Sequence, residues 1–176
     1  IGAALTVSEE SFSQKIVKKR KRRKLKSLLS DDGFKISEVL SEDWATTYEQ
    51  NLIWRKQKGH KNFISTSEIV KARDKFPFSY NALSLRKGNE LVGTAFFLIM
   101  DTKQIYVYSL ITDPLIDFQE PSLLLWKALY EWAQRHNIST IDMGTSMLAD
   151  GRINKSLMHY KLFIGGSLYK KYTLEC

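Results

Sequence analysis

Residues 91–144 read LVGTAFFLIM (91–100), QIYVYSLIT (104–112), an amphipathic segment (122–137) and TIDMG (140–144). The first segment is apolar at almost every position, which is typical of a strand that is covered on both faces. The second segment alternates and ends at Asp113-Pro114, where proline stops strand pairing. The short turn at 101–103 predicts that the two strands form an antiparallel hairpin.

The segment 122–137 changes to the period of a helix and places Leu125 and Leu129 on one stripe. Residues 140–144 then form a short buried strand. A strand, helix and strand in this order predict a right-handed crossover between parallel strands. Because open α/β sheets bind ligands at the carboxyl ends of their strands, we expect a site near 109–112 and 144–146.

The rest of the chain predicts further helices on both sides of this unit. Its length suits one α/β (α+β) domain, with a mixed sheet, an antiparallel meander and a βαβ unit, flanked by helices. The domain is expected at 34–176, preceded by a basic N-terminal helix in 1–33. Capping boxes, glycines and prolines place helices at 11–30, 41–58, 65–75 and 154–163, and strands at 80–86 and 167–174.

The net charge of +8 comes from one short segment, because nine of the twelve residues 15–26 are Lys or Arg. Subtracting nine from +8 leaves the rest of the chain at −1. Such a segment is either a solvated helix face or an electrostatic grip on phosphate, in RNA or in anionic membrane headgroups. The residues expected to bind anions are Lys18, Lys19, Arg20, Arg22 and Arg23.

Several function classes have no support in the sequence. No apolar run approaches the roughly 20 residues that span a bilayer. The one cysteine, Cys176, cannot form an intrachain disulfide, which favours a reducing compartment. His60, His136 and His159 are isolated from one another, so no metal is expected, and the motifs of nucleotide triphosphatases, dehydrogenases and serine hydrolases are missing.

The order of elements resembles the second half of the GNAT acyltransferase fold. The segment IDMGTS (141–146), the pair Tyr160-Lys161 and the exit Gly165-Gly166 are similar to the branch with Fem-type aminoacyltransferases and related acyl-CoA N-acyltransferases. The basic segment 18–26 also resembles the Lys/Arg-rich segment before the domain in those proteins. The resemblance implies a bacterial, cytoplasmic N-acetyltransferase-like enzyme, with the inner membrane surface as an alternative location.

In proteins of this branch, an acyl or aminoacyl group passes from acyl-CoA or aminoacyl-tRNA to an amine. The resemblance implies that the acceptor here is a cell-wall or cell-surface precursor. Relatives that use acetyl-CoA usually carry a Gly-rich loop whose backbone amides hold the pyrophosphate. The corresponding segment here, DFQEPSL (117–123), has no glycine and two carboxylates, so an ordinary helix start is the alternative. The residues expected at the donor are Ser109, Leu110, Ile111, Glu120 and Ser122.

In this fold the amine attacks the donor carbonyl directly, so the protein positions two substrates and removes one proton. The resemblance implies that Asp142 is a base or orients the amine, Tyr160 is a proton donor or shuttle, and Lys161 anchors a phosphate or carboxylate. A structural role stays open for each, as a loop cap, a core ring and a solvent-facing ammonium. The alternative function is a non-catalytic module that binds RNA or anionic membranes through 15–26, and the oligomeric state is undetermined.

Overall fold

The computed structural model describes residues 1–60, 64–148 and 150–170. In these residues a mixed sheet has the strand order β2-β3-β4-β5-β6-β1-β7. Its strands are β1 Gly2–Thr6, β2 Phe34–Glu38, β3 Tyr80–Lys87, β4 Glu90–Ile99, β5 Gln104–Thr112, β6 Thr140–Thr145 and β7 Ser167–Tyr169. The helices are α1 Phe12–Lys15, α2 Lys19–Leu29, α3 Trp44–Gln57, α4 Thr66–Lys75, the 3-10 helix η1 Pro114–Gln119, α5 Ser122–Arg135 and α6 Lys155–Phe163.

The predicted meander and crossover are confirmed. Strands β3, β4 and β5 pair antiparallel in sequence order, and β6 pairs parallel to β5 after the helix α5. The β4–β5 turn is tight because the backbone N–H of Lys103 donates to Asp101 Oδ1 at 2.6 Å. The strand ends where a ligand was expected are therefore the carboxyl ends of the neighbouring strands β5 and β6.

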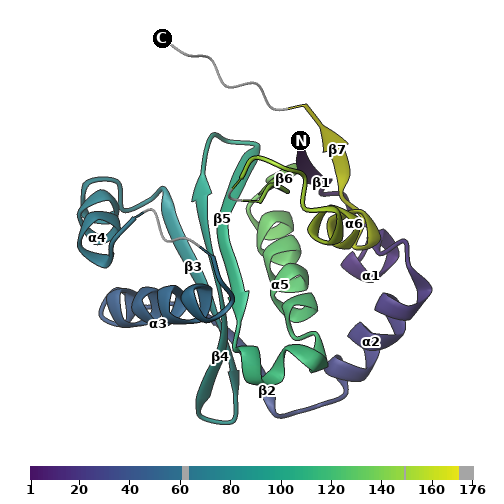
Figure 1. The fold of residues 1–176 in the computed structure, drawn as a ribbon, viewed down its shortest axis with the longest axis horizontal. Helices are drawn as coiled ribbons and strands as arrows, with labels where there is room; N and C mark the ends of the chain where they lie inside the picture. The colour runs from purple at the N-terminus through teal and green to yellow at the C-terminus, as the bar shows by residue number, and fades with distance from the viewer. Residues whose placement is uncertain (61–63, 149, 171–176) are drawn as a thin grey trace.

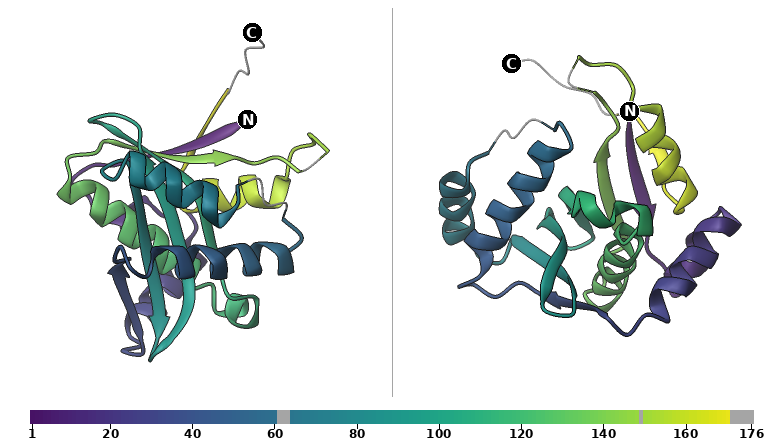
Figure 2. Two further views of the ribbon diagram at one scale, coloured as in Figure 1. Left: turned by 90° about the vertical axis from the view of Figure 1, so that its left-hand side faces the viewer. Right: turned by 60° about the horizontal axis from the view of Figure 1, so that its bottom comes forward.

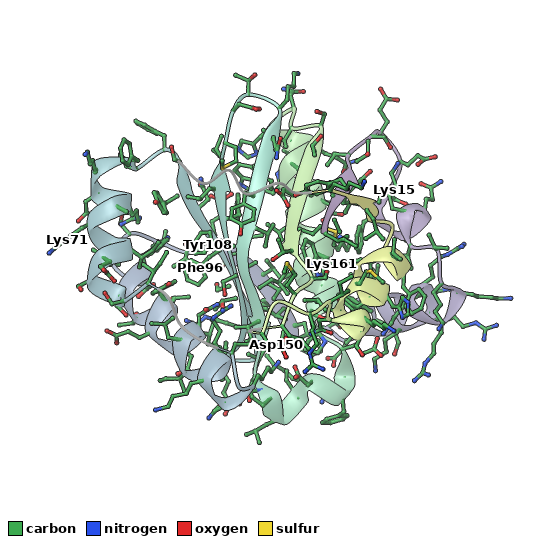
Figure 3. The ribbon with its side chains drawn as sticks, turned by 45° about the horizontal axis from the view of Figure 1, so that its top comes forward. Lys15, Lys71, Phe96, Tyr108, Asp150 and Lys161 are labelled. Carbon is green, nitrogen blue, oxygen red and sulfur yellow. The ribbon has the colours of Figure 1, made fainter. Side chains whose placement is uncertain are left out.

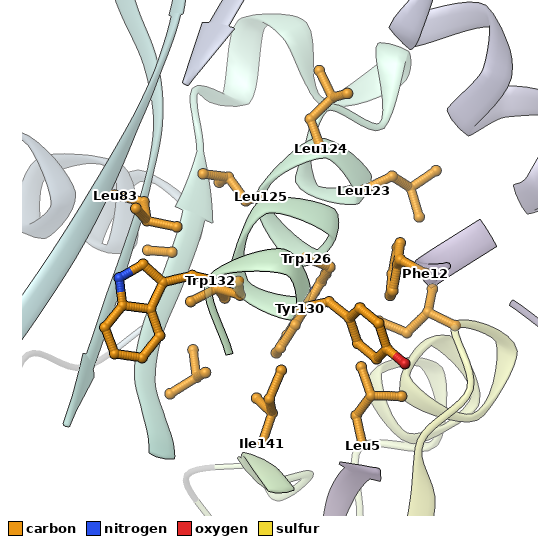
Figure 4. Packing of buried hydrophobic residues seen from close by; sticks show 14 of the residues in the cluster. Leu5, Phe12, Leu83, Leu123, Leu124, Leu125, Trp126, Tyr130, Trp132 and Ile141 are labelled. Carbon is orange, nitrogen blue, oxygen red and sulfur yellow. The ribbon is translucent and has the colours of Figure 1, made fainter. Parts of the chain in front are cut away.

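Helices cover both faces of the sheet (Figures 1 and 2). Helices α3 and α4 lie on one face, and α5 lies on the other, beside α1, α2 and α6. Strand β4 is apolar on both faces because it supplies Phe96 to the α3-side core and Phe97 to the α5-side core. Figure 4 shows the α5-side core, in which Trp126 and Tyr130 are fully or almost fully buried.

The N-terminal strand β1 was not predicted. It lies between β6 and β7 and runs antiparallel to both. Leu5, Phe12 and Leu25 are buried in the α5-side core, so residues 2–29 share one sheet and one core with the rest of the domain. Strand β2, which pairs with β3 at the sheet edge, was also missed, because its short exposed sequence carries little strand signal.

The single helix predicted at 11–30 is wrong, because it is two helices. The expected capping box of Ser11 is present, but α1 ends at Lys15 and α2 begins at Lys19. Between them, Ile16 is fully buried, and the backbone N–H groups of Val17 and Lys18 donate to the Phe163 carbonyl at 3.0 and 3.3 Å. The burial of Ile16 and the hydrogen bonds to the end of α6 therefore stabilise a break between the two helices more than a continuous helix would be stabilised. The final strand is described to Tyr169, and 171–174 lie outside the described residues.

Candidate functional site

Strands β5 and β6 separate partway along their length. Their ladder ends at the pair Tyr106 and Asp142, although β5 continues to Thr112 and β6 to Thr145. Beyond that pair, β5 is no longer paired with β6, so the edge of β5 that faces the opening can hydrogen-bond an extended ligand through its backbone. We call this V-shaped opening between the strands the splay.

A β-bulge at Tyr108 shapes the β5 side of the splay. The pairing of β4 with β5 shifts there, because Phe96 lies opposite Ser109 and Phe97 opposite Val107. Consequently Tyr108 and Ser109 both face α3. Bulges often redirect side chains next to active sites.

The predicted donor residues on β5 lie in different environments. Ser109 Oγ donates to Asn51 Oδ1 at 2.9 Å and accepts from Arg55 at 3.3 Å, so its hydroxyl is part of a buried network with α3. Asn51 continues the network to the Thr94 hydroxyl at 2.8 Å. The next residues, 110–111, are at least half-buried, so their contribution to a ligand is through the backbone.

Two residues that follow the end of the β5–β6 ladder carry a buried hydroxyl without a hydrogen-bond partner. In the described part of the chain, Tyr108 Oη and Ser146 Oγ are the buried side-chain polar atoms that lack one. Tyr108 follows the end of the ladder on β5, and Ser146, which is 1% exposed, follows the end of β6. Burial, and then the nearby Tyr48 and Tyr80, raise the pKa of Tyr108, so its phenol is a neutral donor. Buried polar groups normally have partners, so both hydroxyls point to a ligand.

The end of β6 is built around a buried carboxylate and a buried ammonium. Asp142 Oδ1 accepts from the backbone N–H of Gly144 at 2.7 Å, and Gly144 adopts φ +72°, which favours glycine. Lys161 Nζ, on α6, donates to the carbonyls of Gly144 and Thr145, each at 2.9 Å. Lys161 is 3% exposed, and Figure 3 places it where α6 meets the sheet. Lys161, which was expected to anchor a phosphate or carboxylate, therefore donates to backbone carbonyls.

Tyr160 precedes Lys161 on α6 but contacts a different element. Its hydroxyl lies 2.9 Å from Ser122 Oγ, at the start of α5. Burial raises the pKa of Tyr160, the Ser122 hydrogen bond opposes this, and the charge of Glu120 adds to the rise. The structure thus brings together Tyr160, Ser122 and Glu120, whereas Lys161 joins Asp142 at the end of β6.

The segment that precedes α5 is held by lysines. Glu120 Oε2 lies 2.6 Å from Lys21 Nζ on α2, and Asp117 Oδ2 lies 2.5 Å from Lys58 Nζ after α3. The backbone N–H groups of Leu123 and Leu124 donate to the carbonyls of Glu120 and Pro121, so these amides are satisfied within the helix start. Lys21 was not expected here, because the sequence places it in the middle of the basic segment.

Tyr169 is a second residue that sequence reasoning missed. Burial, and next its proximity to Asp142, raise the pKa of Tyr169. Its ring lies over Gly2 of β1, where an added Cβ would come within 2.5 Å of the ring. Because β1 was not predicted, no sequence signal placed Tyr169 beside Asp142.

The exposed charge of α2 forms a separate surface. Leu25 and Leu28 are buried against the core, and six cations on and before the helix are exposed. We call these six the cationic ridge: Lys18, Lys19, Arg20, Arg22, Arg23 and Lys26. All five residues predicted to bind anions belong to it, whereas Lys21 turns inward to Glu120.

Two cavities lie away from the splay. One, of about 430 Å³, lies between α2, β2 and α5 and is lined by Phe34, Leu124 and Glu131 among others. The other, of about 550 Å³, lies between α3 and the β3–β4 hairpin and is lined by Asp43 and Arg86 among others. We base the candidate site on the splay, because the β5–β6 ladder ends there beside Asp142. Within the described ranges no cluster of His, Cys, Asp and Glu could hold a metal ion, and no helix is long and apolar enough to cross a membrane.

Comparisons with known proteins identify the fold. No protein-family profile matches the sequence, and no curated protein is a significant match. The structure of FemX superposes with a TM-score of 0.75 at 10% identity, over 94% of this chain and 58% of FemX. The chain therefore spans little more than half the length of FemX.

Two acetyltransferase structures match almost over their full length. The aminoglycoside acetyltransferase meta-AAC0020, from an uncultured soil metagenomic sample, gives a TM-score of 0.60 at 16% identity, over 82% of this chain and 99% of its own. A predicted acetyltransferase with acetyl-CoA from Clostridium acetobutylicum gives 0.60 at 14% identity, over 81% of this chain and 95% of its own. The fold is thus GNAT-like and Fem-like, as the closing motifs predicted.

Proposed function

We propose that the chain is an N-acyltransferase domain whose reaction takes place at the β5–β6 splay. The observation that carries the proposal is the strand separation after Tyr106 and Asp142. The unpartnered hydroxyls belong to Tyr108, on the α3 side of β5, and to Ser146, which follows β6. An extended acyl donor arm would pair with the open edge of β5. The two hydroxyls would hydrogen-bond polar groups of the donor or the acceptor.

The reaction joins an amine nitrogen to the donor carbonyl carbon and breaks the bond between that carbon and the carrier. Asp142 would receive the proton that the attacking amine loses, directly or through Tyr169, and this proton would then pass to the carrier oxygen or sulfur as it leaves. Lys161 would fix the end of β6, and with it the position of Asp142, through its two carbonyl contacts. The role of Tyr160 in proton transfer stays a prediction, because its hydroxyl contacts Ser122.

The donor is an acyl-CoA or an aminoacyl-tRNA, and the acceptor amine belongs to a cell-wall or cell-surface precursor. The start of α5 does not fit the pyrophosphate of CoA in this structure. Its first amides are satisfied within the helix start, and the Glu120 carboxylate lies where a second anion would be repelled. Stabilisation by acetyl-CoA or by aminoacylated tRNA, measured as a change in melting temperature, would identify the donor.

Replacing Tyr108 with phenylalanine tests the proposed site. We expect a melting temperature that is unchanged or slightly higher, because the variant removes a buried hydroxyl without a partner. The same variant should lose about fivefold or more in kcat/KM, the order of one hydrogen bond to substrate. Tyr80→Phe on β3 is the matched control, and equal turnover by Tyr108→Phe and wild type would remove Tyr108 from the site.

A second function is favoured by the cationic ridge. Its side chains point away from the core, and exposed like charges one helical turn apart weaken a helix unless an anion lies against them. The domain would then bind RNA or anionic membranes with or without turnover. This function and acyl transfer are compatible, because the ridge and the splay are different surfaces.

The variant Arg20→Gln, Arg22→Gln, Arg23→Gln tests the ridge. We expect weaker binding to tRNA and to vesicles with anionic lipid. The slope of log affinity against log salt concentration should also fall, by the amount that corresponds to up to about three phosphate contacts. The free energy of unfolding should change little, because these side chains are exposed. Binding that is unchanged at low salt would leave the ridge as a solvated helix face.

A further inference from the structure

The short helix η1 presents two large apolar side chains to solvent. Leu115 is 82% exposed and Phe118 is 78% exposed. A 3-10 helix has three residues per turn, so these two side chains lie one turn apart on the same face. Ile116 packs against the α5-side core instead, and Asp113 caps the helix by accepting from the Leu115 N–H at 2.9 Å. Apolar side chains that are exposed together mark surfaces that bind a partner.

Two carboxylates beside this apolar face are paired with lysines. Asp117 Oδ2 lies 2.5 Å from Lys58 Nζ, and Glu120 Oε2 lies 2.6 Å from Lys21 Nζ. The negative charge on and after η1 is thus largely balanced within the domain. Pairing of this kind lowers the repulsion between the apolar face and an anionic partner.

The cationic ridge lies beside η1. Lys21, on the same helix as the ridge, reaches Glu120, the residue that follows η1. Figure 1 accordingly shows the segment between β5 and α5, which contains η1, next to α2. Clusters of about four to eight Lys or Arg next to exposed apolar side chains are typical of proteins that bind anionic membranes. The cations meet the headgroups, and the apolar side chains enter the boundary of the acyl chains.

We propose that η1 and the cationic ridge form one surface that binds an anionic bilayer, with Leu115 and Phe118 inserted below the headgroups. This inference rests on anion binding at the ridge, the second proposed function, and names its partner. The apolar face favours a bilayer over RNA, because RNA bases can stack on an aromatic ring but offer no apolar layer to Leu115. Because η1 directly follows the carboxyl end of β5, the bound domain would hold the splay close to the bilayer.

The double variant Leu115→Ser, Phe118→Ser tests the apolar part of the surface. In co-sedimentation with vesicles of phosphatidylglycerol and phosphatidylcholine, we expect partition about tenfold weaker than in the wild type, because two apolar side chains are no longer buried in lipid. The melting temperature should not change, since both side chains are exposed. Phe78→Ser, Met100→Ser is the matched control. These side chains are 89% and 57% exposed at the opposite end of the β3–β5 meander, and their loss should leave partition unchanged.

A tryptophan at position 118 measures insertion directly. All four tryptophans of the chain are 4% exposed or less, so Phe118→Trp adds a fluorophore that lipid can reach. Vesicles with phosphatidylglycerol whose acyl chains are brominated should quench its fluorescence, and vesicles of phosphatidylcholine alone should not. Phe78→Trp is the matched control and should not be quenched in either.

The outcomes distinguish this surface from the ridge alone. A wild type that does not bind anionic vesicles would overturn the proposal, as would wild-type partition in Leu115→Ser, Phe118→Ser or unquenched fluorescence in Phe118→Trp. If vesicle binding is lost in the triple Arg→Gln variant of the ridge but kept in the double variant, the ridge alone binds anions and the second function stands without insertion. A double variant that loses affinity for tRNA and keeps it for vesicles would replace the bilayer with RNA.

Discussion

Lys161→Met is expected to lower the free energy of unfolding by about 2–4 kcal/mol and to abolish acyl transfer. The buried ammonium donates to the carbonyls of Gly144 and Thr145, and methionine has a similar length but no donor. Both carbonyls would lose their charge-assisted partner in a site that is almost closed to water. The end of β6 would then move, and Asp142, whose carboxylate accepts a hydrogen bond from the Gly144 N–H, would move with it.

The measurement is chemical denaturation and turnover on the same preparations. Lys155→Met is the matched control, because Lys155 is exposed on the same helix, and it should change neither quantity. Stability equal to the wild type in Lys161→Met would contradict the structural role. In that case a loss of turnover alone would restore the simpler prediction that Lys161 acts on the substrate.

The central part of the fold was predictable because its signals are local. Strand β4 is apolar on both faces, the turn before β5 is short, and the crossover helix has a clear helical period. These patterns correspond to one arrangement, a hairpin followed by a parallel strand. The expectation of a ligand site at the strand ends 109–112 and 144–146 follows from the same topology, and the splay lies between these strand ends.

The N-terminal half was less predictable because long-range packing determines it. Strand β1 is five residues long, and its pairing with β6 and β7 joins residues more than 130 positions apart. The break between α1 and α2 depends on the Phe163 carbonyl, which no local pattern reveals. Helix and strand propensities describe a segment in isolation. The pairing of β1 and the break between α1 and α2 depend instead on the segments that pack against them.

The sequence did not reveal the partners of the residues predicted for the candidate site. The aromatic-Lys pair was recognised by resemblance, yet neighbours on one helix point to different elements. Tyr160 reaches Ser122, and Lys161 reaches the end of β6. The contacts of Glu120 with Lys21, and of Tyr169 with Gly2, join segments whose separation in the sequence hides them.

Asp142→Asn is expected to lower kcat by about 100-fold or more, the usual loss when one positioned acid–base group is removed. The variant separates the two roles that Asp142 combines. Asparagine retains a side-chain oxygen that can accept from the Gly144 N–H, so the turn at the end of β6 should be kept. It cannot accept a proton from the amine, so chemistry should fail in folded protein while KM changes little.

Asp101→Asn is the matched control, because Asp101 caps the backbone N–H of Lys103 with the same two-residue spacing at the other end of the ladder. It should retain turnover and melting temperature. Single-turnover rates, with the folded fraction measured for each variant, separate chemistry from stability. Full activity in Asp142→Asn would make Asp142 a loop cap, and the proton of the amine would then have to leave through the phenols of Tyr108 or Tyr169, which double variants with Asp142→Asn would reveal.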